Sequence, residues 1–398
     1  MDAHESAQLI EFESRHMSGG FPRRKVVITR GEGARLFDQE GNEFLDLAAA
    51  NGWGCVGHTH AEVTRAIQDQ AARLVFYTEG GFNDQRALWM KELCAVLAES
   101  LGETERGAVS IIHPCSSGTE AVEGAIKVAR LFTGRPGIVA TERGFHGRTL
   151  GSLSATWKPH YRDPFQPLVP GFRHVPFNDI NALDGALTDD VAAFLLEPVQ
   201  GEGGVHLATA GFVEALQRLS RERGVLIIAD EVQTGLGRTG AWFASERIGL
   251  RPDVVALGKA LGGGIPMGAV AWREALGKIE AGRHASTFGG NPLACAASRA
   301  VLKVVRDERL PERSARLGDR VRRELEARAL PMVKEVRGLG LMIGIELDQE
   351  VAPVIGKLME RRIWALPAGP RVLRLLPPLV ISEEDLNRGV AAISEVLG

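Results

Sequence analysis

The fold of this chain is decided by two stretches, Val225-Leu226-Ile227-Ile228-Ala229-Asp230 and Val254-Val255-Ala256-Leu257-Gly258-Lys259. Each is a short apolar run that ends in an ionisable residue. A run that is apolar at every position is typical of a strand covered by helices on both faces. The amphipathic pattern of residues 212–219, just before the first run, predicts one of those helices.

The same alternation extends over much of the chain. Further apolar runs lie at 109–112, 137–140 and 193–196, with amphipathic segments between them. Alternating strands and helices predict an α/β domain with a mostly parallel sheet. After about residue 294 one long charged amphipathic stretch, 294–328, precedes strand-like segments at 340–346 and 372–376. These favour a second, smaller α+β domain.

The N-terminal segment has a hairpin-like pattern, in which residues 26–28 and 34–37 flank a turn at 30–33. We expect this segment to pack with the C-terminal domain. The predicted division is an N-terminal segment, a large domain and a small domain, at residues 1–48, 49–294 and 295–398.

Composition and charge exclude several classes of protein. Apolar residues make up 44% of the chain and the net charge is −3, so nothing indicates binding to nucleic acid or to a membrane surface. No uncharged apolar run approaches the roughly 20 residues of a membrane span. The four cysteines form no CxxC pair, and the N-terminal residues contain no apolar signal core. Both features favour a cytoplasmic protein with reduced thiols.

Residues able to do chemistry follow these strands at their carboxyl ends, where open α/β sheets bind ligands. The segment 116–119 opens a helical pattern, so its backbone N–H groups could hold a phosphate or could simply belong to a capped helix. Asp230 follows a buried strand and needs a metal, an ion pair or a cationic ring as partner. Lys259 follows the next strand, where a low pKa would suit Schiff-base chemistry, although such a lysine can also reach the surface.

Two weaker motifs point elsewhere. Residues 235–240 fit GxGxxG, but no helical pattern opens at Gly240 and no acidic residue ends a strand about 20 residues later, which disfavours a dinucleotide site. His58 and His60 have no further ligands at metal spacing, so structural roles are favoured. The sequence therefore predicts no metal site.

Together, a phosphate-binding turn, a buried aspartate and a buried lysine match the phosphate, ring nitrogen and aldehyde of pyridoxal 5'-phosphate. The chain resembles the class III (subgroup II) aminotransferases, which have the aspartate-aminotransferase fold, pyridoxal-phosphate fold type I. The matching segments occur in the family's order, at 117–121, 144–149, 197–204, 230–235, 258–264 and 287–292. Within the class it looks most similar to the acetylornithine branch and its lysine-pathway relative, which acts on aminoadipate semialdehyde carried by a small acidic protein, LysW. Ser116 and Val122 depart from the asparagines usual in these enzymes.

The resemblance implies a role for each matching residue. Lys259 would bond the cofactor and move the substrate's proton, and Asp230 would keep the ring nitrogen protonated. Phe145 and Val232 would sandwich the ring, and Gln233 would bond its phenolic oxygen. The phosphate would be bound by Ser117, Gly118 and Thr119, joined by Thr287 from a second subunit. The active sites would therefore be shared in a homodimer.

Substrate recognition is implied in the same way. Arg374 and Arg148 would bind the two carboxylates of 2-oxoglutarate, and Glu202 would neutralise Arg374 when an amine donor reacts. The resemblance implies transfer of a terminal amino group from an N-acylated diamino acid, such as N-acetylornithine, to 2-oxoglutarate. The products would be a semialdehyde and glutamate, in arginine or lysine biosynthesis.

Several alternatives stay open. LysW-bound aminoadipate semialdehyde, ornithine and 4-aminobutyrate are other amine partners, and a small acidic carrier protein could present the substrate. A decarboxylase, aminomutase or racemase on the same scaffold is disfavoured because Arg148, Glu202 and Arg374 are all present. A pseudoenzyme is disfavoured because Lys259 and Asp230 are both retained.

Overall fold

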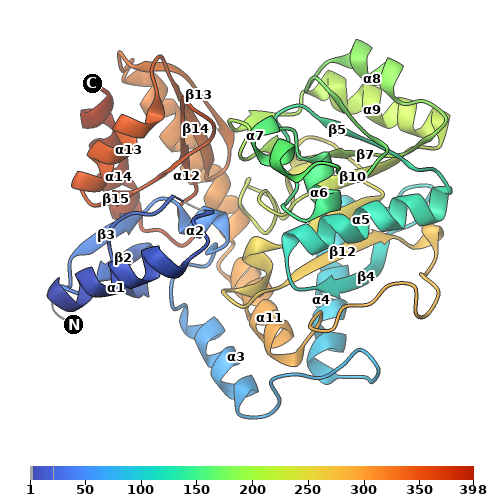
Figure 1. The fold of residues 1–398 in the computed structure, drawn as a ribbon, viewed down its shortest axis with the longest axis horizontal. Coiled ribbons are helices and arrows are strands. Elements are labelled where there is room, and N and C mark those ends of the chain that lie inside the picture. The colour runs from blue at the N-terminus through green and yellow to red at the C-terminus, as the bar shows by residue number, and fades with distance from the viewer. Residues whose placement is uncertain (1–2, 21) are drawn as a thin grey trace.

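The computed structural model describes residues 3–20 and 22–398, and over those residues the largest sheet has seven strands in the order β4-β12-β11-β10-β7-β5-β6 (Figure 1). They are β4 (Val109–Cys115), β5 (Gly137–Thr141), β6 (Phe172–Val175), β7 (Val191–Leu196), β10 (Leu226–Asp230), β11 (Val254–Leu257) and β12 (Gly268–Arg273). Only β12 runs against its neighbours, β11 and β4. This confirms the predicted α/β fold with a mostly parallel sheet.

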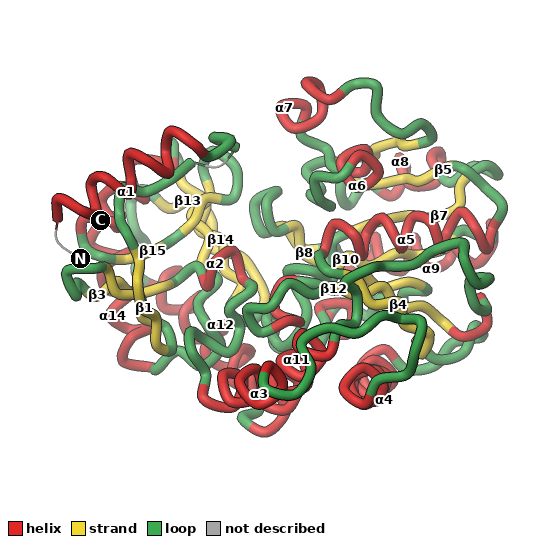
Figure 2. The backbone as a smooth tube through the Cα atoms, turned by 60° about the horizontal axis from the view of Figure 1, so that its bottom comes forward, coloured by secondary structure: helices red, strands yellow, loops and turns green. Residues whose placement is uncertain are grey.

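Successive side chains of a strand point to opposite faces of the sheet. Helices cover both faces of this sheet because its central strands carry apolar side chains on both of them. Leu195 and Ile228 pack in one cluster with α5 (Gly118–Thr133). Their neighbours Leu196 and Ile227 pack in another with α8 (Ile180–Ala186) and α9 (Ala210–Arg223). The red helices and yellow strands of Figure 2 show this layering.

The long amphipathic stretch predicted at 294–328 is two helices, not one. They are α11 (Pro292–Asp307) and α12 (Leu310–Ala327). Arg309 between them adopts a left-handed φ of 51°, and Pro311 lies in the first turn of α12, where its missing N–H costs nothing. Next to α11 lie α3 (Ala61–Ala71) and α4 (Asp84–Leu101).

Two smaller sheets lie apart from the large one (Figure 1). The first has β1 (Ile28–Glu32), β2 (Arg35–Asp38), β3 (Glu43–Asp46) and β15 (Ile363–Trp364), with β15 parallel to β3. The second has β13 (Val333–Leu339), β14 (Met342–Leu347), β17 (Val372–Leu375) and β16 (Leu366–Pro367). The C-terminal helices are α13 (Val351–Glu360) and α14 (Glu383–Leu397), and α1 (Ala3–His16) opens the chain.

The N-terminal hairpin turns later than predicted. Residues 30–32 belong to β1, and the turn is at Gly33 and Ala34, because Glu32 pairs with Arg35 and Gly33 adopts a positive φ of 56°. Of the predicted segment 1–48, residues 1, 2 and 21 lie outside the described residues. The short helices are α2 (Ala49–Gly52), α6 (Leu150–Ala155), α7 (Pro159–Arg162) and α10 (Ala244–Arg247). Within residues 3–20 and 22–398, no helix has the length and apolarity to cross a membrane.

Candidate active site

The carboxyl ends of three neighbouring strands bring the predicted catalytic residues to one edge of the sheet. Ala229 on β10 pairs with Leu196 on β7, and Asp230 pairs with Ala256 on β11. Glu197, Asp230 and Lys259 therefore follow adjacent strands. Lys259 opens a short 3₁₀ helix, Lys259–Gly262, with a φ of 43°, which is uncommon for a residue other than glycine.

Asp230 is buried and held by two hydrogen bonds. One of its carboxylate oxygens lies 2.8 Å from His146 Nδ1, and the other accepts from the backbone N–H of Val232 at 3.1 Å. His146 is itself buried, and its Nε2 has no partner in the described chain. Sequence reasoning missed His146, although it lies inside the matching segment 144–149.

Lys259 is a partly buried amine in a strongly charged surrounding. Burial lowers the pKa of Lys259, and Arg374 lowers it further. Glu202, Asp230 and Glu197 act in the opposite direction without cancelling the effect. The Lys259 amine makes no hydrogen bond to the described residues, so it is free to act as a nucleophile or base in its neutral form.

The N-terminus of α5 supports both sequence interpretations, the helix cap and the phosphate site. Ser117 Oγ accepts from the backbone N–H of Glu120 at 3.3 Å, and the Glu120 carboxylate accepts from the N–H of Ser116 at 2.7 Å. The Ser117 bond is an N-cap, and the Glu120 bond reaches one residue before the N-cap instead of the N-cap itself, as it would in a capping box. The N–H groups of Gly118 and Thr119 find no acceptor in the described chain, so they remain available to an anion.

Gly118 allows two segments to meet at this helix start. A Cβ atom at this position would lie only 2.6 Å from Val232 Cγ1. Any side chain would therefore push Val232 and the turn after Asp230 away from α5. The glycine keeps the free N–H groups next to the edge that carries Asp230.

Hydrogen bonds to the Thr119 hydroxyl hold the segment that carries Arg148. Thr119 Oγ1 lies 2.6 Å from Ser152 Oγ and 2.9 Å from Thr149 Oγ1, and it accepts from the backbone N–H of Arg148 at 3.2 Å. The exposed Arg148 guanidinium stacks on Tyr161, with Cζ 3.8 Å from the ring centroid. An arginine presented on an aromatic ring and without a carboxylate partner in the described chain is suited to bind an anionic substrate group.

Arg374 comes from the C-terminal sheet and is almost fully buried, 1% exposed. Its Nη1 donates to Glu202 Oε1 at 2.6 Å and to Gln233 Oε1 at 3.1 Å, while its Nε has no partner in the described chain. Glu202 lies in the turn between β8 (Val199–Gln200) and β9 (His206–Leu207). Burial would raise the pKa of Glu202, but Arg374 and Lys259 more than offset this and the pKa is lowered.

Two of the remaining predicted site residues, Phe145 and Gln233, lie at this place, whereas Thr287 is not hydrogen-bonded to it in the described chain. Phe145 lies beside the site, because its backbone N–H bonds Glu197 and its ring packs edge-on against Tyr161 at 6.0 Å. Thr287 is exposed on the loop after β12 and makes no hydrogen bond to Ser117, Gly118 or Thr119 among the described residues. The Gln233 side-chain oxygen is occupied by Arg374.

The arrangement fits pyridoxal phosphate. The two unpaired N–H groups of α5 suit its phosphate, the buried Asp230 carboxylate suits a protonated ring nitrogen, and the Lys259 amine suits its aldehyde. The three groups belong to adjacent elements of one sheet edge, as a single planar cofactor requires.

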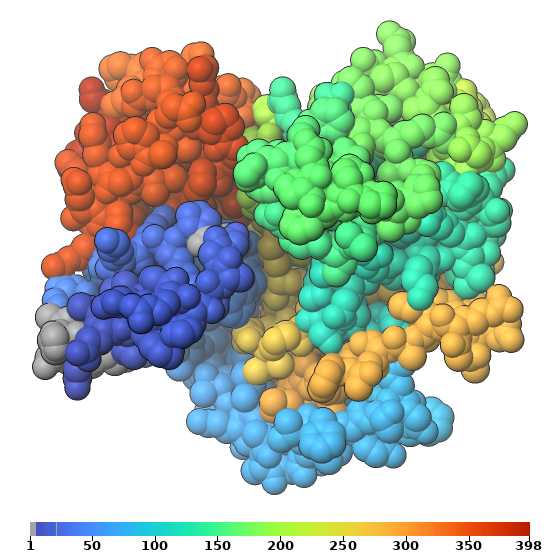
Figure 3. All heavy atoms as spheres, viewed as in Figure 1, coloured from blue at the N-terminus to red at the C-terminus, as the bar shows by residue number. Residues whose placement is uncertain are grey.

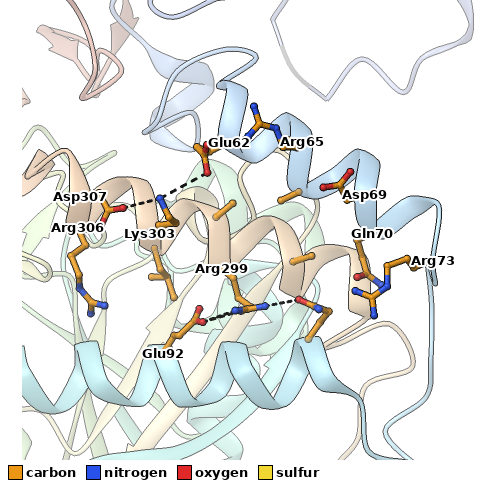
Figure 4. Close-up of a pocket in the computed structure, with 15 residues that line it drawn as sticks. Glu62, Arg65, Asp69, Gln70, Arg73, Glu92, Arg299, Lys303, Arg306 and Asp307 are labelled. Atoms are coloured by element: carbon orange, nitrogen blue, oxygen red, sulfur yellow. Dashed lines mark hydrogen bonds and ion pairs between the residues drawn. The ribbon is translucent and has the colours of Figure 1, made fainter.

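The pocket in Figure 4 lies elsewhere, between α3, α4 and α11. No predicted site residue lines it. Several of its charged side chains pair with one another: Lys303 lies between Glu62 and Asp307, and Arg299 pairs with Glu92. We therefore do not assign the reaction to this pocket.

The residues of the two weaker motifs make ordinary structural contacts. His58 bonds Asp46 at 2.7 Å and His60 bonds Glu308 at 3.1 Å, so the two rings have separate carboxylate partners. Residues 235–240 form turns, and no helix opens at Gly240. The described residues contain no cluster of three or more His, Cys, Asp or Glu that could hold a metal ion.

Comparison with known proteins gives consistent matches over nearly the whole chain. Residues 19–397 match the family model for class III aminotransferases. The acetylornithine aminotransferase of Methanopyrus kandleri is 45% identical over 95% of this chain and 95% of its own length. The [LysW]-aminoadipate semialdehyde transaminase of Deinococcus radiodurans is 42% identical over 97% of this chain and 89% of its own.

Solved structures agree. The ornithine aminotransferase of Toxoplasma gondii superposes with a TM-score of 0.92 at 34% identity, covering 98% of this chain and 94% of that one. A second structure of that protein, with the same scores and coverage, is described with pyridoxal phosphate at partial occupancy in its active site. The acetylornithine aminotransferase of Elizabethkingia anophelis gives a TM-score of 0.84 at 33% identity, covering 98% of both chains.

Proposed function

Because the chain belongs to the class III aminotransferase family, whose members depend on pyridoxal phosphate, we propose that it transfers a terminal amino group from an N-acylated diamino acid to 2-oxoglutarate. The donor resembles N-acetylornithine, and the products are a semialdehyde and glutamate. The reaction belongs to arginine or lysine biosynthesis. The names of the Methanopyrus kandleri and Deinococcus radiodurans relatives support these two pathways.

The observation that carries this proposal is the ion pair between Arg374 and Glu202, 2.6 Å apart and close enough to Lys259 to change its pKa. A cation that binds the carboxylate of 2-oxoglutarate must be neutralised when the donor presents only a terminal amine. Glu202 neutralises it, since an unpaired buried charge is strongly unfavourable. Arg148, exposed on Tyr161, takes the distal carboxylate.

Each of the residues that fit pyridoxal phosphate then has one role toward it. Bound pyridoxal phosphate supplies an electrophilic aldehyde and an electron-withdrawing ring. Lys259, whose pKa is lowered by burial, would hold the cofactor at its aldehyde and would hold or release a proton at Nζ. The Asp230 carboxylate, which His146 orients, would hold the ring nitrogen. Gly118 and Thr119 bind the phosphate with backbone N–H groups.

A donor screen with 2-oxoglutarate as acceptor tests the substrate. We expect N-acetylornithine or another N-acylated diamino acid to give the highest kcat/KM, with ornithine, 4-aminobutyrate and the LysW-bound substrate as alternative amine partners. The screen contradicts the proposal if no terminal amine reacts while α-amino acids do.

We also propose a homodimer with shared active sites, in which Thr287 completes the partner's phosphate site. Large apolar side chains are exposed on two neighbouring segments: Phe76 and Phe82 are 76% and 104% exposed, and Phe288 is 70% exposed. The segments adjoin, because the N–H of Leu293 donates to Val75 O at 3.4 Å (Figure 3). Exposed apolar surface of this kind marks an interaction site.

Two further points belong to the same proposal. A small acidic carrier protein could present the substrate, which the name of the Deinococcus radiodurans relative and the exposed Arg148 and Lys158 support. The location is the cytoplasm, in keeping with four unpaired cysteines.

A further inference from the structure

The buried carboxylate of Glu197 joins two parts of the site that lie far apart in the chain. Glu197 follows β7 and is 5% exposed. Its Oε1 accepts from the backbone N–H of Phe145, and its Oε2 accepts from the N–H of Gly201, both at 2.9 Å. Phe145 precedes His146, the partner of Asp230, and Gly201 precedes Glu202, the partner of Arg374.

Both hydrogen bonds are at full strength only when the Glu197 carboxyl group is ionised, because each oxygen then accepts without carrying a proton. No other described side chain bonds both of these N–H groups. Glu197 therefore links the segment at Phe145 directly to the turn that bears Glu202. Gln200 makes a second link nearby, because its Nε2 donates to Glu142 O at 2.7 Å.

We infer that Glu197 is a positioning residue that sets the cofactor-facing segment at Phe145 and the substrate-facing turn at Glu202 in one common arrangement. This inference rests on the proposed function, because it takes the roles of Phe145 and Glu202 from it. Glu197 touches neither reactant and acts through its two neighbours.

Three ionisable groups face Glu197. His146 and Asp230 lie at the same strand edge, and Lys259 follows the next strand but one. Burial raises the pKa of Glu197 to about 7, Asp230 adds to the increase and His146 opposes it. Protonation near neutral pH would weaken one of the two hydrogen bonds and so loosen both segments together.

Glu197→Gln tests the inference in the holoenzyme, with Glu142→Gln as a matched control. The amide introduced by Glu197→Gln keeps one oxygen acceptor but turns its NH₂ toward the other N–H donor. Glu142 directly follows the neighbouring strand β5, and its carboxylate makes no hydrogen bond to the described residues. Visible circular dichroism of the bound cofactor reports on the Phe145 side. The ratio of single-turnover rates with glutamate and with N-acetylornithine reports on the Glu202 side.

Glu197→Gln should change both readouts, the donor ratio by about tenfold, which corresponds to one hydrogen bond to a charged group. Glu142→Gln should change neither. A variant in which one readout moves and the other keeps its wild-type value contradicts the inference, because the two sides would then be independent.

If Glu197→Gln fails to fold, hydrogen exchange of the wild-type holoenzyme tests the inference without the variant. After correction for intrinsic pH dependence, peptides covering 143–146 and 199–202 should lose protection together between about pH 8 and about pH 6. Unchanged protection, or a change in only one peptide, contradicts the inference. If the wild-type enzyme accepts no terminal amine, the proposed function fails, and hydrogen exchange alone then decides whether Glu197 couples the two segments.

Discussion

Arg374 donates through Nη1 to Glu202 Oε1 over 2.6 Å, and this ion pair joins the C-terminal sheet to the turn between β8 and β9. The arginine is 1% exposed, so its charge has no access to bulk water. Glu202 is the carboxylate that balances it, and under the proposed function a substrate carboxylate would replace Glu202.

Glu202→Gln should favour glutamate over donors that react through a terminal amine. The amide keeps the size of the side chain but removes the negative charge, so Arg374 stays available to an α-carboxylate. The expected change in the rate ratio is roughly 5- to 150-fold, equivalent to about 1–3 kcal/mol for one charge-assisted pairing. Single-turnover kinetics with each donor measure it. An unchanged ratio would mean that pocket shape, not Glu202, selects the donor.

Lys259→Ala should abolish covalent attachment of the cofactor. The amine lies at the end of β11 and has a lowered pKa, whereas alanine offers no nucleophile. Borohydride reduction followed by peptide mapping should find the pyridoxyl group on Lys259 in the wild type and on no residue in the variant. A pyridoxyl group on another lysine of the wild type would refute the assignment.

Asp230→Ala should fold and retain some cofactor but lose most activity. Its carboxylate is positioned by His146 and Val232, and removal of a preorganised charge commonly reduces kcat by about 10²-fold or more. Steady-state kinetics, with circular dichroism as the control for folding, measure the effect. Near-normal turnover would show that Asp230 is not the counter-ion of the ring.

Mixed dimers should test whether Thr287 serves the partner subunit. Lys259→Ala lacks the catalytic amine, and Thr287→Ala should weaken phosphate binding. If the sites are shared, a hybrid dimer has one site with both wild-type residues. Random exchange in a 1:1 mixture makes half of the dimers hybrids, so about a quarter of the wild-type activity per site should be restored. No recovery after confirmed subunit exchange would mean that Thr287 serves its own chain.

His174 should make the protein less stable in acid. Burial lowers the pKa of this histidine to about 4, so the folded state stays neutral while the unfolded state takes up a proton below about pH 6.5. The free energy of unfolding therefore falls as the pH drops from about 6.5 toward 4, by on the order of 1–2 kcal/mol at pH 5. His174→Gln should show a smaller loss between pH 7 and pH 5 in urea unfolding. Equal losses in both proteins would exclude this histidine as a cause.

The sequence predicted best those strands that are buried over their whole length, because they are apolar at every position. The runs at 193–196, 225–229 and 254–257 are apolar at every position, and all three are strands of the large sheet. It did not predict β6, an edge strand whose centre is Arg173 and His174, or β12, the antiparallel strand. The amphipathic period continues across the break at Arg309, so it could not reveal that 294–328 is two helices.

The candidate site shows the same limit. Asp230 and Lys259 could be found because each directly follows a strand, and strand ends gather at one edge. The contacts of His146 and Glu197 could not be found, since their partners are distant in the chain and no local pattern pairs them. The proposed role of Thr287 in a partner's site would require a second chain, and the domain division at 48/49 and 294/295 is untested. Both remain predictions.

The parallel pairing of β3 with β15 matters for how the protein is made. Leu45 pairs with Ile363, so every residue between them must be synthesised before this sheet can close. Until then β3 is an unpaired edge strand in addition to β1, and unpaired edges invite aggregation. Pairing β3 with β15 also closes a very long loop, and the conformational entropy lost in closing it slows the formation of this sheet. The synthesis of β15 therefore sets when β3 becomes paired on this side.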